Sequence, residues 1–270
     1  MTTATGTTAV QPREGRMARR AFAYWLTNYR RVWRGSLISG FLGPLFFLVA
    51  MGFGLGTLID DGATGGLGTP GYVQFIAPGI LAAQAMQTAV GESTFPVMGA
   101  LKWQRQYHAM LAAPLGIADV VLGHVVFVTM RVAITSVAFA VVAVVLGAIT
   151  SWWVLLAVPA AVLTGLAFTT PVFAFAARQD DDSGFNVLFR FIVMPMFLFS
   201  GTFFPVEQLP GVLEAVARVT PLWHGVELCR SLVTGTATAL GSLGHVAYLT
   251  AWAAGGLWLA FASFRKRLVT

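Results

Sequence analysis

Six long stretches of apolar residues alternate with shorter polar segments along this chain. They cover about residues 36–58, 72–101, 120–147, 152–177, 187–206 and 243–263. A helix needs about 20 residues to cross the hydrocarbon core of a bilayer, where its backbone groups must bond within the segment. We therefore predict an all-α polytopic membrane protein with a six-span transmembrane domain in residues 35–270. In the long second stretch, Gly91 and Pro96 predict a kink or an extension into the cytoplasm.

The first 34 residues follow a different pattern. Residues 1–16 are small and polar and lack the apolar core of a signal peptide, so we expect a disordered cytoplasmic tail. Residues 17–34 place Phe22, Trp25, Leu26, Tyr29 and Trp33 at helical spacing, with arginines largely off that face. This pattern predicts an amphipathic helix lying in the headgroup layer of the membrane. A short helix packed on a partner is the alternative.

Residues 207–242 are too long and too apolar for a simple turn between the fifth and sixth stretches. Residues 212–219 predict a short helix closed by Pro221. A second apolar stripe follows, with polar residues on the opposite side; the stripe is Leu222, Val226, Cys229 and Val233, and the polar residues are His224, Glu227 and Ser231. Two re-entrant helices in the outer leaflet fit this pattern. A helical cap on the membrane surface fits it equally.

The composition agrees with a membrane as the solvent. Hydrophobic residues make up 57% of the chain, charged residues 10%, and the mean hydropathy is +0.75, which excludes an ordinary soluble enzyme or a disordered chain. The net charge is +6, and 13 of the 17 basic residues fall on one side of the predicted spans. By the positive-inside rule, both termini are cytoplasmic and the protein lies in the cytoplasmic membrane. The positive charge therefore marks orientation and does not indicate nucleic-acid binding.

Signals for catalysis are weak. The two lysines, Lys102 and Lys266, do not end a glycine-rich phosphate-binding loop, and no His-Glu-x-x-His motif is present. The acidic run at 180–182 is interpreted as a solvated or helix-capping cluster rather than a metal site. We expect a non-catalytic subunit with no cofactor on this chain. If ATP drives it, ATP and Mg²⁺ bind a partner ATPase.

Two ionisable residues fall within the predicted spans, where charge is costly. Arg131 lies about 16 Å into the third span at 1.5 Å per residue, whereas Glu92 lies near the inner end of the second. A straight-helix picture does not bring them together. Arg131 is therefore interpreted as a snorkelling or helix-bridging residue in preference to a transport residue.

The cytoplasmic segment from Lys102 to Asp119 mixes aromatic, basic and apolar residues. Tyr107, Met110 and Leu111 fall on one helical face before Pro114 ends the helix. An apolar face on a cytoplasmic helix requires something to cover it. Docking into a partner ATPase and packing on the protein's own amphipathic helix both remain open.

Several strings give the chain a family resemblance. They are Phe75–Ala89 (FIAPGILAAQAMQTA), Glu92-Ser-Thr, the segment Lys102–Leu115, Phe199–Pro210 (FSGTFFPVEQLP), and Pro221-Leu-Trp-His224 with Arg230 six positions later. In order and spacing these resemble the ABC-2 family of transporter permeases. Within it they resemble the branch of daunorubicin-type drug exporters and nodulation lipo-oligosaccharide exporters. The resemblance covers about residues 17–265.

The resemblance implies a half-transporter that exports amphipathic small molecules, or a lipid-linked sugar or glycolipid. It pairs with a second permease copy, in a homodimer in preference to a heterodimer, and each copy docks on a separate ATPase. An ion- or proton-coupled carrier is the alternative from another class.

The resemblance also assigns residues to three roles. ATPase coupling falls to Arg30, Arg31, Lys102, Arg105, Tyr107, Met110 and Leu111. The translocation path, between the first, second and fifth spans, falls to Met86, Gln87, Met194, Met196, Phe197 and Phe199. The outer re-entrant signature is Pro221, His224, Glu227 and Arg230. Membrane lipids surround the assembly, and no nucleic acid is expected.

Overall fold

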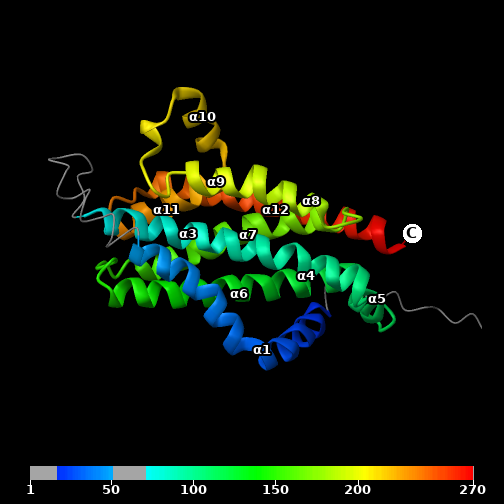
Figure 1. Cartoon of the computed structure of the whole chain (residues 1–270). Helices are drawn as coiled ribbons and strands as arrows, with labels where there is room; N and C mark the ends of the chain where they lie inside the picture. Colours follow the sequence, from blue (N-terminus) through cyan, green and yellow to red (C-terminus); the bar gives the residue numbers. More distant parts are fainter. Residues whose placement is uncertain (1–16, 51–70, 270) are drawn as a thin grey trace, which may run out of the picture.

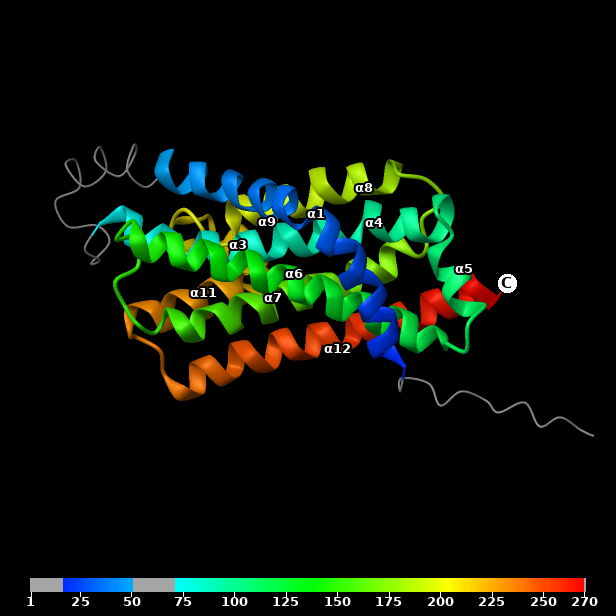
Figure 2. The same cartoon turned by 90° about the horizontal axis from the view of Figure 1, so that it is seen from below.

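The computed structural model describes residues 17–50 and 71–269 of the chain, and within these ranges it contains helices and short connections but no strand. The predicted tail at 1–16 and the end of the first apolar stretch lie outside the described residues. The long helices lie side by side along one common direction (Figures 1 and 2).

The amphipathic segment continues without a break into the beginning of the first apolar stretch as one helix, α1 (Ala18–Phe47). This helix changes direction along its length in both views (Figures 1 and 2). Its first part packs on the third long helix, α6 (Ile117–Val145), where the backbones approach closely. A Cβ added at Gly123 would lie 2.5 Å from the Ala21 Cβ and 2.9 Å from the Ala18 carbonyl oxygen.

The second apolar stretch contains the predicted kink. Helix α3 (Tyr72–Ser93) stops at Thr94, whose φ and ψ are −98° and −96°. The chain resumes as α4 (Phe95–Met98), the π-helical turn η2 (Gly99–Trp103) and α5 (Gln106–Leu111). Pro96 explains the break, because proline has no N–H for the Glu92 carbonyl and its ring clashes with that oxygen in a regular helix.

The third, fourth and sixth stretches are confirmed as helices with small shifts in their ends. They are α6, α7 (Val154–Ala176) and α12 (Ala239–Val269). Helix α7 is central, since α3, α6, α11 and α12 all pack on it. The Thr170 hydroxyl crosses to α12, donating to the Ala253 carbonyl at 2.9 Å.

The fifth stretch is shorter than the predicted range 187–206. Helices α8 (Ser183–Leu188), η3 (Phe189–Val193) and α9 (Met194–Phe199) follow one another and end at Phe199. Gly201 has φ of 79°, a left-handed conformation that cannot continue a helix. The predicted end at 206 is therefore wrong, and the chain reaches a 3₁₀ turn, η4 (Val206–Gln208), through a bent connection at residues 200–205.

The two short helices predicted in 207–242 are present. Helix α10 (Gly211–Val219) projects from the bundle, whereas α11 (Pro221–Thr234) lies against α3 and α7 (Figure 1). The predicted apolar stripe of α11 is buried, and His224, Glu227 and Ser231 are half-buried. The Thr220 hydroxyl caps α11, accepting from the Trp223 N–H at 3.3 Å.

By length and apolar composition, four helical segments of the described residues can cross a membrane: 72–103, Ile117–Val145, Val154–Ala176 and Ala239–Val269. The segment Ser183–Phe199 is apolar but shorter. The fold is thus an all-helical membrane protein in which four of the six predicted spans meet both criteria.

Candidate functional site

A cavity of about 410 Å³ lies where α1, α3 and the α8–α9 segment meet. Its lining is mainly apolar with two glutamines, and comprises Gly43, Ile80, Gln84, Gln87, Phe189, Val193, Met194 and Phe197. The ring of Phe197 is held edge-to-face against Phe203, with centroids 5.0 Å apart. Cavities of this size accept drug-sized ligands, with a few polar groups setting their orientation.

Three of the six residues predicted for the translocation path line this cavity: Gln87, Met194 and Phe197. Met86 does not, because its side chain is fully buried. Met196 packs partly buried against the core, and Phe199 is 40% exposed outside the cavity.

Sequence reasoning missed the other lining residues, although a signal for them existed. Ile80, Gln84 and Gln87 have the i, i+4, i+7 spacing of one helical face. Phe189, Val193 and Phe197 repeat at i, i+4, i+8 in the same way.

The segment after α3 is held by a cluster of aromatic rings around His124 of α6. The Tyr107 hydroxyl shares a 2.5 Å hydrogen bond with His124 Nδ1. Trp25 of α1 stacks on the imidazole ring of His124, with ring centroids 3.9 Å apart and planes inclined by 15°. Phe264 of α12 contacts Tyr107 edge-to-face at 5.5 Å. Four helices, α1, α5, α6 and α12, therefore meet at this cluster.

The apolar face of α5 is thus covered by the protein itself. Tyr107 is fully buried, Met110 is 8% exposed, and Leu111 packs against the core. Of the two alternatives for this face, the structure shows packing against the protein's own amphipathic helix. Burial raises the pKa of Tyr107 well above its usual value, so the phenol stays neutral.

Four of the predicted coupling residues are basic and lie at least partly on the surface. Arg30 and Arg31 lie on the exposed side of α1, and Arg105, also exposed, has the left-handed φ of 50° that starts α5. Lys102 is half-buried and donates a hydrogen bond to the Asp180 carbonyl. Of the predicted coupling residues, Tyr107 and Met110 are buried, whereas these four and the half-buried Leu111 keep exposed surface.

Two residues of the acidic run at 180–182 form hydrogen bonds with the ends of helices α12 and α8. Asp180 accepts a hydrogen bond from Arg267 of α12 at 2.7 Å, and this contact holds the pKa of the carboxyl below its usual value. The Asp181 carboxylate accepts from the N–H of Ser183, the first residue of α8, at 3.0 Å. Helix α8 has no side-chain cap: its N-cap residue, Asp182, makes no capping hydrogen bond, and Asp181 bonds to the first helical residue from the position before the cap.

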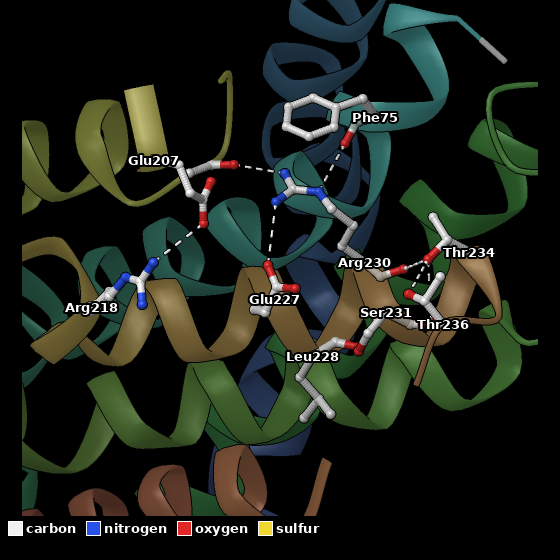
Figure 3. A network of polar contacts seen from close by, with 10 residues as sticks. Phe75, Glu207, Arg218, Glu227, Leu228, Arg230, Ser231, Thr234 and Thr236 are labelled. Carbon is white, nitrogen blue, oxygen red and sulfur yellow. Dashed lines mark hydrogen bonds and ion pairs between the residues drawn. The ribbon is translucent and has the colours of Figure 1, made fainter. Parts of the chain in front are cut away.

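At the opposite end of the bundle, Arg230 of α11 holds three segments together (Figure 3). Its guanidinium donates to the Gly201 carbonyl at 2.6 Å and to the Phe75 carbonyl at 3.5 Å. It also lies 4.0 Å from the centre of the Phe75 ring and 3.7 Å from the Glu227 carboxylate. The predicted signature residue thus fixes α11 to α3 and to the turn after α9.

The remaining signature residues also make packing contacts. Pro221 occupies the first turn of α11 and is buried. His224 Nδ1 lies 2.8 Å from His245 Nδ1 of α12, and its ring stacks on Tyr248 at 3.9 Å.

One expectation about the spans is wrong. Arg131 Nη2 and Glu92 Oε1 form an ion pair at 2.7 Å, although a straight-helix picture kept them apart. The two helices run in opposite directions from one connection: Glu92 precedes Trp103 by 11 residues and Arg131 follows Ile117 by 14. At 1.5 Å per residue these depths are about 16 and 21 Å, a gap that an arginine side chain spans. Of the interpretations of Arg131, the structure shows a bridge between helices.

Comparison with known proteins found a matching family and similar relatives. The family profile described as "ABC-2 type transporter" matches residues 20–234. The chain is 33% identical over 252 residues to Nodulation protein J of Rhizobium leguminosarum bv. trifolii, covering 92% of this chain and 93% of that protein. It is 31% identical over 253 residues to Nodulation protein J of Rhizobium meliloti, with the same coverage of each.

Proposed function

The chain belongs to the ABC-2 type transporter family, and on this basis we propose that it is the permease subunit of an ATP-binding-cassette exporter of amphipathic small molecules. In this family the membrane subunit is generally non-catalytic and works with an ATP-binding subunit. The observation that carries the proposal is the cavity of about 410 Å³ between α1, α3 and the α8–α9 segment.

The chemistry of that cavity suits an amphipathic ligand. Phe197, Met194 and Val193 offer apolar contact, and methionine adapts its shape to different ligands. Gln84 and Gln87 place amides on the same wall, and amides bond both donors and acceptors. None of the described residues that line this cavity is charged. It therefore fits a molecule with a large apolar part and a neutral polar part.

The proposed topology is six spans with both termini in the cytoplasm of the cell. In it, α1 enters the membrane after its amphipathic part, and Ser183–Phe199 forms the fifth span. Helices α10 and α11 form the re-entrant pair on the outer side. The exposed apolar face of α10, with Val212 and Val216 at 79% and 60% exposure, then meets lipid.

The proposed coupling uses the four accessible basic residues, Arg30, Arg31, Lys102 and Arg105. A partner ATPase that closes on ATP pushes on α1 and on the 102–115 segment, which the ring cluster around His124 joins into one body. Helices α3 and α9 then shift as rigid elements with two arrangements. A second copy of the permease, with a homodimer favoured, completes the path.

A glycolipid is the second candidate substrate, because the relatives described above are named nodulation proteins and the sequence resembles the branch that contains lipo-oligosaccharide exporters. Stimulation of ATP hydrolysis separates the candidates. Amphipathic drugs and a lipo-oligosaccharide are added in turn to the purified complex, and the compound class that raises the vanadate-sensitive rate is the substrate class.

The test of the proposal is co-expression of the chain with a candidate nucleotide-binding protein. We expect a stable complex with vanadate-sensitive ATP hydrolysis and efflux of amphipathic compounds. Phe197→Asp should abolish efflux without disrupting the complex, because it places a charge in the apolar cavity. Phe197→Leu, which keeps an apolar side chain at the same position, is the matched control. Gradient-driven transport without any ATPase subunit would overturn the proposal.

A further inference from the structure

Arg131 and Glu92 form an ion pair at the junction of three helices. Beyond the 2.7 Å contact with Glu92 of α3, the Arg131 guanidinium of α6 lies over the Tyr29 ring of α1, 4.7 Å from its centre. The Tyr29 ring is 8% exposed and contacts Phe127 edge-to-face at 6.0 Å. The side chains of Arg131 and Glu92 are 11% and 25% exposed. One arginine therefore contacts the amphipathic helix and the cavity-lining helix at once.

Holding three helices together with this ion pair costs desolvation free energy that apolar contacts would not cost. Both charges are taken largely out of water, and apolar residues of similar volume hold buried contacts as well or better. Ionisable groups within apolar membrane helices are rare and usually serve function. Packing alone therefore does not explain why either residue is charged. The location of the two residues along their helices suggests a functional reason.

Each partner of Arg131 lies next to a region with a proposed role. Tyr29 immediately precedes Arg30 and Arg31, the exposed arginines of α1. Glu92 follows Gln87, a cavity-lining residue, by five residues on the uninterrupted helix α3. Five residues of helix correspond to about 7.5 Å. Motion of α1 therefore reaches the cavity wall through two contacts and a short rigid helix.

We propose that Arg131, Glu92 and Tyr29 are positioning residues that couple displacement of α1 to displacement of the cavity wall on α3. This inference rests on the proposed function. The three residues act through the helices they join. Glu92 lies two residues before the interruption of the helix at Thr94. This interruption lets α3 move without moving the segment that follows it.

The experiment reports on the cavity wall without requiring the substrate. In a Cys229→Ala background, which removes the only cysteine, Gln87→Cys places a thiol on the wall. Its labelling by a maleimide is timed in the permease–ATPase complex, with and without ATP and vanadate. We expect the labelling rates to differ severalfold between the two conditions in the parent, and their ratio to fall to one in Glu92→Gln and in Arg131→Gln.

Further variants separate coupling from folding. Arg131→Lys should retain the ratio, because an ammonium group keeps a cation between the Glu92 carboxylate and the Tyr29 ring. Tyr29→Phe keeps a ring under the cation and should retain the ratio, whereas Tyr29→Leu should reduce it. The matched control is Glu214→Gln with Arg218→Gln, which removes a 2.6 Å ion pair within the surface helix α10 and should leave the ratio unchanged.

The outcomes distinguish this inference from the proposed function. No complex with an ATPase, or no nucleotide dependence in the parent, overturns the proposed function. A nucleotide-dependent parent whose ratio survives in Glu92→Gln and Arg131→Gln overturns the coupling role alone. If both single variants fail to assemble, Arg131→Lys decides: a lysine variant that assembles, hydrolyses ATP and shows a ratio of one also overturns the coupling role.

Discussion

The close contact of α6 with α1 at Gly123 provides a sharp stability test, because two of the atoms that an added Cβ would meet belong to the backbone. At Gly123, an added Cβ would lie 2.5 Å from the Ala21 Cβ and 2.9 Å from both the Ala18 carbonyl oxygen and the Phe22 nitrogen. Carbon atoms in contact normally lie about 3.5–4.0 Å apart. Two of the three obstacles are backbone atoms, which cannot rotate away. Gly123→Ala therefore forces α1 and α6 apart by about 1 Å.

The magnitude is a balance of two effects. Overpacking a well-packed contact costs about 1–3 kcal/mol, and the rigid backbone obstacles place this site near the upper value. Replacing a helical glycine by alanine returns about 1 kcal/mol. The net loss is about 2 kcal/mol, which for a chain of this size lowers the midpoint of thermal unfolding by about 4–8 °C. Gly91→Ala in α3, where nothing lies within 4 Å of the added Cβ, should raise it by about 2–4 °C.

The assay uses the one cysteine of the chain as its reporter. Cys229 is fully buried, and burial raises the pKa of its thiol to about 12. A fluorogenic maleimide therefore reacts with it only as the bundle opens, and the reaction is followed during heating in detergent. If Gly123→Ala unfolds at the parent temperature or above, the close packing of α1 on α6 is refuted.

Three further predictions use the same readout. Tyr107→Phe leaves His124 Nδ1 buried without its partner and should cost about 1–3 kcal/mol. Asp180→Asn should destabilise the protein at neutral pH: the pKa of Asp180 is held down by Arg267, so its contribution is full above the unfolded-state pKa and is lost as pH falls through the folded-state pKa. The difference between Asp180→Asn and the parent should vanish at acid pH, and a pH-independent difference would contradict this. Arg230→Lys keeps the charge but loses the planar fork that reaches two carbonyls, and should cost about 1–3 kcal/mol.

The sequence alone predicts those helices whose ends are marked by a change in composition. The ends of α6 and α7 fall within three residues of the predicted ranges, because polar residues and a tight turn bound each apolar run. The buried stripe of α11 was predictable because polar residues occupy its other face. The end of the fifth stretch was missed although the sequence carries a signal for it, since Gly201 and Pro205 are residues that typically end a helix.

The candidate site was predictable only in part. Helix α6 is apolar on nearly every side, so periodicity does not show which of its faces meets a neighbour. On α3, Met86 and Gln87 are adjacent in sequence, and only the spacing of Gln87 with Ile80 and Gln84 separates the cavity residue from the core residue. To predict the ion pair between Arg131 and Glu92, the distance of each residue along its helix must be counted from the connection between α3 and α6.

The early end of the α8–α9 segment has a consequence for the membrane around it. In the proposed topology the segment Ser183–Phe199 crosses the bilayer as a helix of about 26 Å, some 4 Å less than an average hydrocarbon core. A short span is accommodated by local thinning of the lipid or by flanking side chains that reach to the interface. Because Met194 and Phe197 of this segment line the cavity, lipid acyl-chain length should modulate the cavity wall. We expect transport rates in reconstituted vesicles to decline as the bilayer thickens.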